Sequence, residues 1–147
     1  LVPDPPEALT SSFGWDVVQN KVMLTSVLAA IKEAGARSSL FIDPDFTAYD
    51  TLQELAPDRV ELYTYNYAKH AIQSPETATM DYAKTAESVH QLGIELNAGH
   101  DLNQHNLRLF LTHVPHIKEV SIGHALICEA LEDGLKHTIE SYLKALP

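Results

Sequence analysis

The chain is poor in cysteine, tryptophan and positive charge, and it has no long apolar run. Its single Cys128 cannot form an intramolecular disulfide, which is typical of a reducing compartment. No stretch approaches the roughly 18 consecutive apolar residues that span a membrane, and no basic segment followed by an apolar one opens the chain. We therefore expect a cytoplasmic protein with no membrane partner.

Basic residues are outnumbered two to one, because 10 Lys and Arg face 20 Asp and Glu for a net charge of −10. Nucleic-acid partners are not expected, since such proteins usually present a basic face to phosphates. Small phosphorylated ligands are compatible with this charge, because backbone N–H groups at a helix start can hold a phosphate. With 45% hydrophobic and 20% charged residues, residues 1–147 are expected to form a single globular domain.

What the chain does contain is an alternation of short apolar runs with amphipathic helices. Strands are predicted at 38–43, 59–64, 94–99 and 119–123, and Leu1-Val2 resembles the end of a fifth. Such alternation with short connections predicts a parallel sheet with helical crossovers. A complete (β/α)8 barrel needs at least about 200 residues. The pattern therefore leaves two architectures open, a flavodoxin-like doubly wound sheet and the last five units of a barrel.

Polar residues gather where the predicted strands end, which is the edge that binds ligands in both architectures. Glu61 and Tyr63 alternate along one strand, so both face the same side. Facing inward, Glu61 is a candidate base, with a structural ion pair as the alternative. His100 follows the Asn-Ala-Gly turn at 97–99, and histidine suits proton transfer near neutral pH.

The segment 95–107, ELNAGHDLNQHNL, contains two histidines and two acids. His100 and His105 are five residues apart, so they do not share a helix face as the two histidines of a zinc-binding H-E-x-x-H helix do. With no second cysteine either, we expect no metal site. Asp101 or Asn103 is expected to cap the next helix, with His105 packing or capping, because such residues favour caps whatever the function. Glu95 is expected on the helix-facing or edge side of its strand.

The segment after the last predicted strand, SIGHALICEAL, places Gly123 and His124 at the start of a helix. The free N–H groups of a helix start bind anions. In barrels, phosphate sites are typically built from the loops after strands seven and eight. Together with the NAGH turn one unit earlier, the Gly-His pair predicts a phosphate site.

Taken in order, the segments LVPD, SLFIDPD, VELYT, LGIELNAGHDLNQHN and VSIGHALI resemble the pyridoxine 5'-phosphate synthase family of the deoxyxylulose-dependent vitamin B6 pathway. The resemblance covers essentially the whole chain. It implies a TIM (β/α)8 barrel of which about the last five units are present, so that the first three units are lacking. It also implies a transferase that condenses 1-deoxy-D-xylulose 5-phosphate with 3-amino-2-oxopropyl phosphate and closes the pyridine ring. The family uses no cofactor and forms octamers.

Matched to the family's motifs, the acid–base residues of the reaction fall on Glu61 and His100. The substrate- and phosphate-binding positions fall on Thr10, Asp101, Gly123 and His124. The chain departs from the family where Asp101 follows NAGH in place of glycine, and where Tyr63 and Tyr65 replace the histidine and glycine of an HTG motif. These departures support an alternative function, a divergent or truncated non-catalytic half-barrel that acts as an oligomerising or phosphate-binding module.

Overall fold

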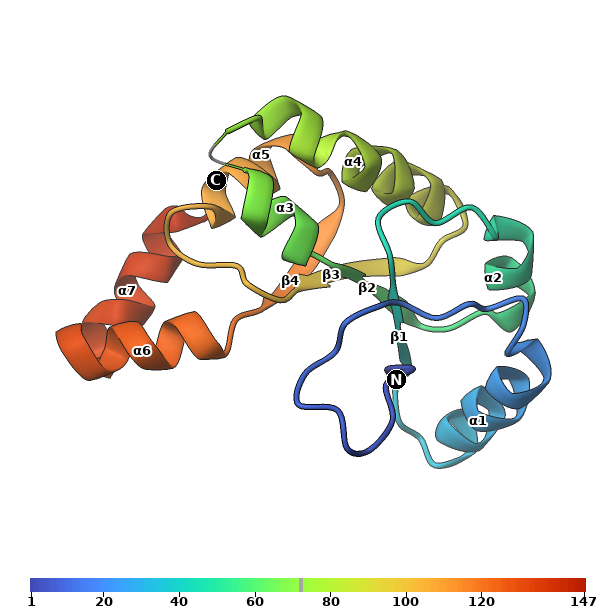
Figure 1. The fold of residues 1–147 in the computed structure, drawn as a ribbon. Helices are drawn as coiled ribbons and strands as arrows, with labels where there is room; N and C mark the ends of the chain where they lie inside the picture. The colour runs from blue at the N-terminus through green and yellow to red at the C-terminus, as the bar shows by residue number, and fades with distance from the viewer. Residues whose placement is uncertain (72) are drawn as a thin grey trace.

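The computed structural model describes residues 1–71 and 73–147. Its centre is a parallel sheet whose strands follow one another in sequence order (Figure 1). The strands are β1 (Ser39–Ile42), β2 (Arg59–Tyr63), β3 (Glu95–Gly99) and β4 (Ile117–Ser121). A barrel is wound in this consecutive order, whereas a doubly wound sheet reverses its strand order. The α/β prediction is confirmed, and the arrangement is that of a partial barrel.

The predicted fifth strand is reduced to one pair of hydrogen bonds at Leu1. The Leu1 amino group donates to the Ser39 carbonyl at 2.7 Å, and the Phe41 N–H donates to the Leu1 carbonyl at 3.1 Å. In a parallel ladder, one residue donates a backbone hydrogen bond to one residue of the neighbouring strand and accepts one from the residue two positions further along that strand. Leu1 therefore lies in the place of a strand beside β1, although the described residues contain four strands and not the predicted five.

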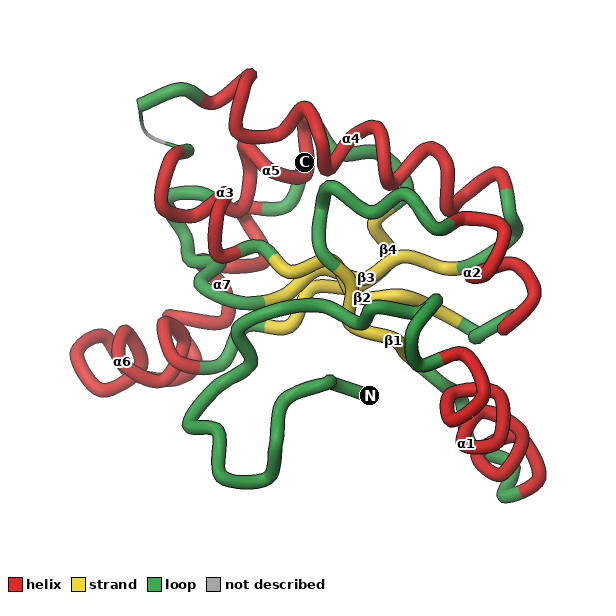
Figure 2. The backbone as a smooth tube through the Cα atoms, turned by 45° about the vertical axis from the view of Figure 1, so that its right-hand side comes forward, coloured by secondary structure: helices red, strands yellow, loops and turns green. Residues whose placement is uncertain are grey.

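Seven helices are present among the described residues. They are α1 (Lys21–Glu33), α2 (Tyr49–Leu55), α3 (Tyr65–His70), α4 (Pro75–Gln91), α5 (Leu107–His113), α6 (His124–Asp133) and α7 (Leu135–Ala145). Figure 2 shows α2, α4 and α5 on one side of the sheet and the loop of residues 1–20 on the other. Helices α6 and α7 form a hairpin beyond β4 (Figure 1). No helix of residues 1–71 and 73–147 is both long and apolar enough to cross a membrane.

The two faces of the sheet differ in chemistry because side chains alternate along each strand. The helix-facing set is at most 1% exposed and consists of Leu40, Ile42, Val60, Leu62, Leu96 and Ala98. These side chains form the core together with apolar residues of the helices, among them Leu24, Leu52 and Phe110. The opposite face carries Phe41, Glu61, Tyr63, Asn97 and Gly99 at the intervening positions. The fold thus places polar and aromatic side chains on the face that is free of helices.

Several predicted boundaries shift. β4 covers Ile117–Ser121 and not 119–123, and the register of its pairing with β3 shifts between Leu96 and Asn97. The acidic segment Asp43-Pro44-Asp45 does not begin a helix, since α2 begins at Tyr49. The Asp43 carboxylate instead accepts the Gly14 N–H at 2.9 Å. Helix α3 was not predicted, because its six residues are too few to show a helical period.

Candidate functional site

A cavity of about 1430 Å³ lies at the C-terminal ends of the strands, on the face opposite the helices. The N-terminal loop, β2 and the loops that follow β3 and β4 line it. All of the predicted site residues contribute to its wall: Thr10, Glu61, His100, Asp101, Gly123 and His124. A smaller cavity of about 620 Å³ near α3 and α4 contains none of them. The structure therefore brings residues from four separate segments to one place.

Glu61 enters the cavity wall from the middle of β2. The Glu61 carboxylate lies over the Gly99 backbone, so that a side chain at position 99 would have to displace Glu61 Oε1. Burial raises the pKa of Glu61, and the nearby His100 partly offsets this rise. The described residues form no ion pair with Glu61. Arg59, two residues earlier on the same face of β2, pairs with Glu95 and Glu119 instead. This leaves a partly buried carboxyl group available for proton exchange.

His100 follows β3 directly, and its ring lies against two aromatic rings. The ring centroid is 5.1 Å from that of Phe41 and 5.2 Å from that of Tyr63. Tyr65 stacks on Tyr63 at 6.0 Å with an interplanar angle of 12°. Tyr63 and Tyr65 thus extend an aromatic wall into the cavity.

The backbone of the loop after β3 adopts an unusual conformation. His100 has φ +82° and Asp101 has φ +56°, so two consecutive non-glycine residues lie in the left-handed region. The predicted cap at Asp101 is wrong, because Asp101 is exposed and the N-cap of α5 is Asn106. Asn103 does form the local turn, since its side-chain oxygen accepts the N–H groups of His105 and Asn106 at 2.9 and 3.2 Å.

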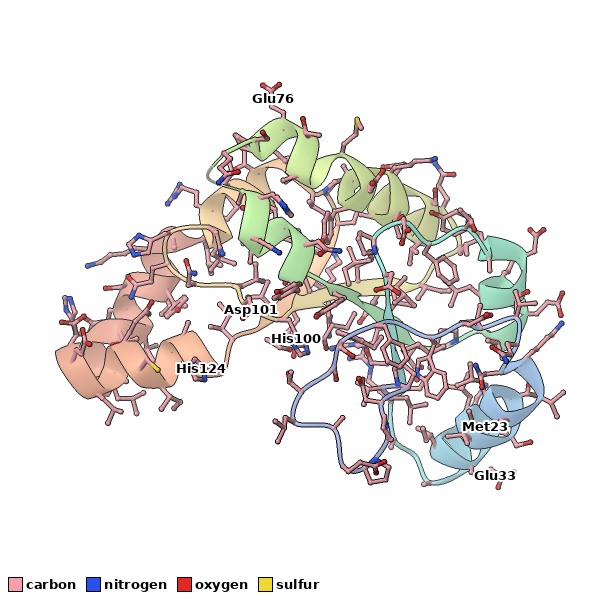
Figure 3. All side chains as sticks on the ribbon, viewed as in Figure 1. Met23, Glu33, Glu76, His100, Asp101 and His124 are labelled. Atoms are coloured by element: carbon pink, nitrogen blue, oxygen red, sulfur yellow. The ribbon has the colours of Figure 1, made fainter. Side chains whose placement is uncertain are left out.

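Gly123 and His124 form the start of α6, with Gly123 as the N-cap. Because the N-cap is a glycine, it supplies no side-chain cap to the first N–H groups of this helix. Figure 3 shows His100 and Asp101 at the end of β3 and His124 nearby, whereas Met23, Glu33 and Glu76 lie on distant helices. A helix start on the wall of a polar cavity can bind an anion such as phosphate.

The sequence interpretation missed a polar cluster at the other end of the same face. Arg59 contacts Glu119 at 2.7 Å and Glu95 at 3.0 Å. Glu95 therefore faces the same side of the sheet as Glu61. The prediction that Glu95 lies on the helix-facing or edge side of its strand is wrong. The alternation of side chains along β2 indicates that Arg59 shares a face with Glu61, because the two residues are two positions apart. The pairing itself depends on strands 36 residues apart in sequence.

Residues 1–71 and 73–147 contain no cluster of three or more His, Cys, Asp or Glu side chains that could hold a metal ion. Of the two histidines His100 and His105, only His100 lines the cavity. The prediction that the protein uses neither a metal nor an organic cofactor stays a prediction.

Comparison with known proteins adds a family assignment to this geometry. The family model described as "Pyridoxal phosphate biosynthesis protein PdxJ" matches residues 1–147. A pyridoxine 5'-phosphate synthase of Christiangramia forsetii is 45% identical over 99% of this chain and 62% of its own length. Proteins of the same name from Cytophaga hutchinsonii and Phocaeicola vulgatus are 43% and 44% identical, each over 99% of this chain and 61% of their own length. The chain therefore spans about three fifths of the curated relatives it matches.

Proposed function

The chain belongs to the PdxJ family of pyridoxal phosphate biosynthesis proteins, and we propose that it takes part in the synthesis of pyridoxine 5'-phosphate. The proposed reaction condenses 1-deoxy-D-xylulose 5-phosphate with 3-amino-2-oxopropyl phosphate and closes the pyridine ring. The chain would contribute the C-terminal units of the barrel, in one domain that extends over residues 1–147. A single core cluster that includes residues of β1 to β3 and of six helices supports the one-domain proposal.

The observation that carries this proposal is the convergence of two proton-exchanging groups and an anion-binding helix start in one cavity. Glu61 has a raised pKa, so its carboxyl group can hold and release a proton closer to neutral pH than an exposed glutamate. His100 offers a second acid–base group beside it. A ring-closing condensation needs several proton transfers, and two such groups on one wall can serve them.

Substrate binding is assigned to the cavity rim. The N–H groups at Gly123 and His124 would hold a phosphate at the positive end of α6. The loop that contains Thr10 borders the same cavity and would cover the bound substrate. The backbone at Asp101 completes the rim, although its carboxylate has the same charge as the ligand.

We further propose that the protein forms a homo-oligomer, an octamer as in its family, in the cytoplasm. Apolar side chains exposed on α6 and α7 support burial in a larger assembly, since exposed apolar surface of this kind marks contact sites. They are Ile127, Leu131, Leu135, Ile139 and Leu143. Sedimentation of the protein at micromolar concentration measures the assembly, and a monomer throughout would contradict it.

The second candidate function is a non-catalytic half-barrel, and the 40–45% identity to curated synthases does not favour it. The exposed Asp101 carboxylate lies on the rim of the anion site, where the family has glycine. A repelled phosphate binds more weakly, which would reduce turnover more than it would change the fold.

Replacement of His100 by Asn tests the proposed function. We expect turnover of the two phosphorylated substrates to fall about 10²- to 10⁴-fold, because a general acid–base group is lost. His105→Asn is the matched control, since His105 is exposed and outside the cavity wall. Equal effects of the two substitutions would refute the assignment of His100, and a wild-type protein that binds phosphate without turnover would favour the second candidate.

A further inference from the structure

We infer that Thr64 is a positioning residue that holds His100 in the cavity by clamping the carbonyl groups at the end of β3. The role of His100 in proton transfer rests on the proposed function, whereas the clamp is a feature of the geometry. Thr64 itself does not line the cavity. It acts through the backbone of the neighbouring strand.

Thr64 follows β2 directly and is completely buried. Its backbone N–H donates to the Gly99 carbonyl at 2.9 Å, which continues the ladder between β2 and β3 by one residue. Its hydroxyl Oγ1 lies 2.6 Å from the Gly99 carbonyl oxygen and 2.5 Å from the His100 carbonyl oxygen. The single proton of this buried hydroxyl group is therefore shared, as a bifurcated hydrogen bond, between the two carbonyls that flank the turn from strand to loop.

This turn needs a restraint because it is strained. His100 at φ +82° and Asp101 at φ +56° both lie where an L side chain crowds the following carbonyl. Such conformations persist only where the surrounding structure over-determines them. The Asn106 side-chain amide holds the next carbonyl, that of Asp101, at 3.0 Å. Thr64 and Asn106 thus hold the strained pair from its two ends.

The ring of His100 has no comparable anchor of its own. Among residues 1–71 and 73–147 its neighbours of fixed geometry are the rings of Phe41 and Tyr63, which make tilted and edge contacts. These contacts orient the ring but do not fix the backbone from which it projects. Because the side chain follows its backbone, release of the carbonyl clamp would let the His100 ring leave the position beside Glu61. The hydroxyl of Thr64 therefore determines whether the two acid–base groups stay together.

The substitution Thr64→Val tests the clamp, because valine has the shape of threonine without the hydroxyl. We expect NMR cross-peaks between the His100 ring and the rings of Phe41 and Tyr63 to be present in the wild-type protein and lost in Thr64→Val. Thr64→Ser keeps the hydroxyl and should restore the cross-peaks. Unchanged cross-peaks in Thr64→Val would overturn the inference, as would their loss in Thr64→Ser.

Thr85→Val is the matched control. Thr85 is also a buried threonine, and its hydroxyl donates to the Pro44 carbonyl at 2.6 Å, away from His100. A similar general loss of stability is expected in both valine variants, but the His100 cross-peaks should survive in Thr85→Val. Their loss in both variants would show a merely structural effect and overturn the inference.

A measurement on the wild-type protein covers the case in which Thr64→Val does not fold. A buried hydroxyl proton held between two carbonyls exchanges slowly with water, so we expect a separate NMR signal with couplings to the Gly99 and His100 carbonyl carbons. Absence of that signal at low temperature would overturn the clamp. Turnover offers a further readout, in which Thr64→Val should lower kcat roughly 10- to 100-fold with KM unchanged, and Thr64→Ser should recover it. If His100→Asn leaves turnover intact, the proposed function fails while the cross-peak result still decides the clamp.

Discussion

Substitution of Asp101 separates two physical effects that coincide at one residue. Asp101 lies at φ +56°, beside His100 at φ +82°, and its carboxylate borders the cavity. Glycine adopts this conformation without crowding, so Asp101→Gly should relieve strain of about 1 kcal/mol, after allowance for the greater freedom of glycine in the unfolded chain. For a chain of 147 residues, this corresponds to a rise in Tm of about 4 °C.

The charge effect has a different signature. Two like charges about 8 Å apart at an effective dielectric constant of about 20 repel by about 2 kcal/mol, and salt screening reduces this to about 1–2 kcal/mol. Loss of the Asp101 carboxylate should therefore tighten the binding of inorganic phosphate roughly 5- to 30-fold. The gain should shrink as the salt concentration rises.

Asp101→Asn is the control that separates the two effects, because asparagine keeps the size of aspartate and tolerates the left-handed region but carries no charge. We expect Asn to improve phosphate binding with little change in Tm, and Gly to improve both. Calorimetric unfolding and isothermal titration with phosphate measure the two quantities. A Tm that does not rise in Asp101→Gly would refute the strain reasoning, and unchanged phosphate affinity in both variants would refute the charge reasoning.

Three further substitutions test the fold and the electrostatics of the site. Gly14→Ala should destabilise the protein by about 1–3 kcal/mol in urea unfolding, because its new methyl group would meet the backbone at the end of β1. A loss of unfolding free energy no larger than that of a substitution to Ala at an exposed position would contradict this close approach. Glu61→Gln should raise Tm at pH 7. Burial raises the pKa of Glu61 in the folded state, so the stability of the wild-type protein falls as the pH rises from the unfolded-state pKa through the folded-state pKa. The difference in Tm should vanish below the unfolded pKa of about 4.3, and a constant difference between about pH 3 and about pH 7 would contradict this origin. Tyr67→Phe should cost about 1–3 kcal/mol of unfolding free energy, because the buried Asn106 carbonyl loses the Tyr67 hydroxyl at 2.6 Å; an unchanged denaturation midpoint would show that water replaces the bond.

The pattern of the sequence was sufficient for the β/α alternation and for the place of the site. Apolar runs such as 59–64 and 94–99 predict β2 and β3 to within one residue, because a strand that is covered on one face leaves a local apolar signature. The ends of parallel strands meet at one edge, so Glu61 and His100 could be expected together from their places in the chain alone. The family resemblance is confirmed by the comparison with known proteins.

Other features depend on partners that are distant in sequence. The register of β4 shifts against β3, and the pairing of Arg59 with Glu95 and Glu119 joins three strands. Glu95 was misplaced for this reason. Local periodicity carries no information about which residue of one strand lies opposite a given residue of the next, and a bulge changes that correspondence for every later position.

The sequence by itself thus determined the order of strands and helices and the residue types at the strand ends, because both follow from local patterns of polarity. The tertiary structure alone decided how His100 is held. The aromatic rings against it and the carbonyl clamp from Thr64, which hold its left-handed backbone, come from segments 35 or more residues away in sequence. A strained conformation exists only where such distant groups stabilise it, so it is a property of the packed chain and not of the turn.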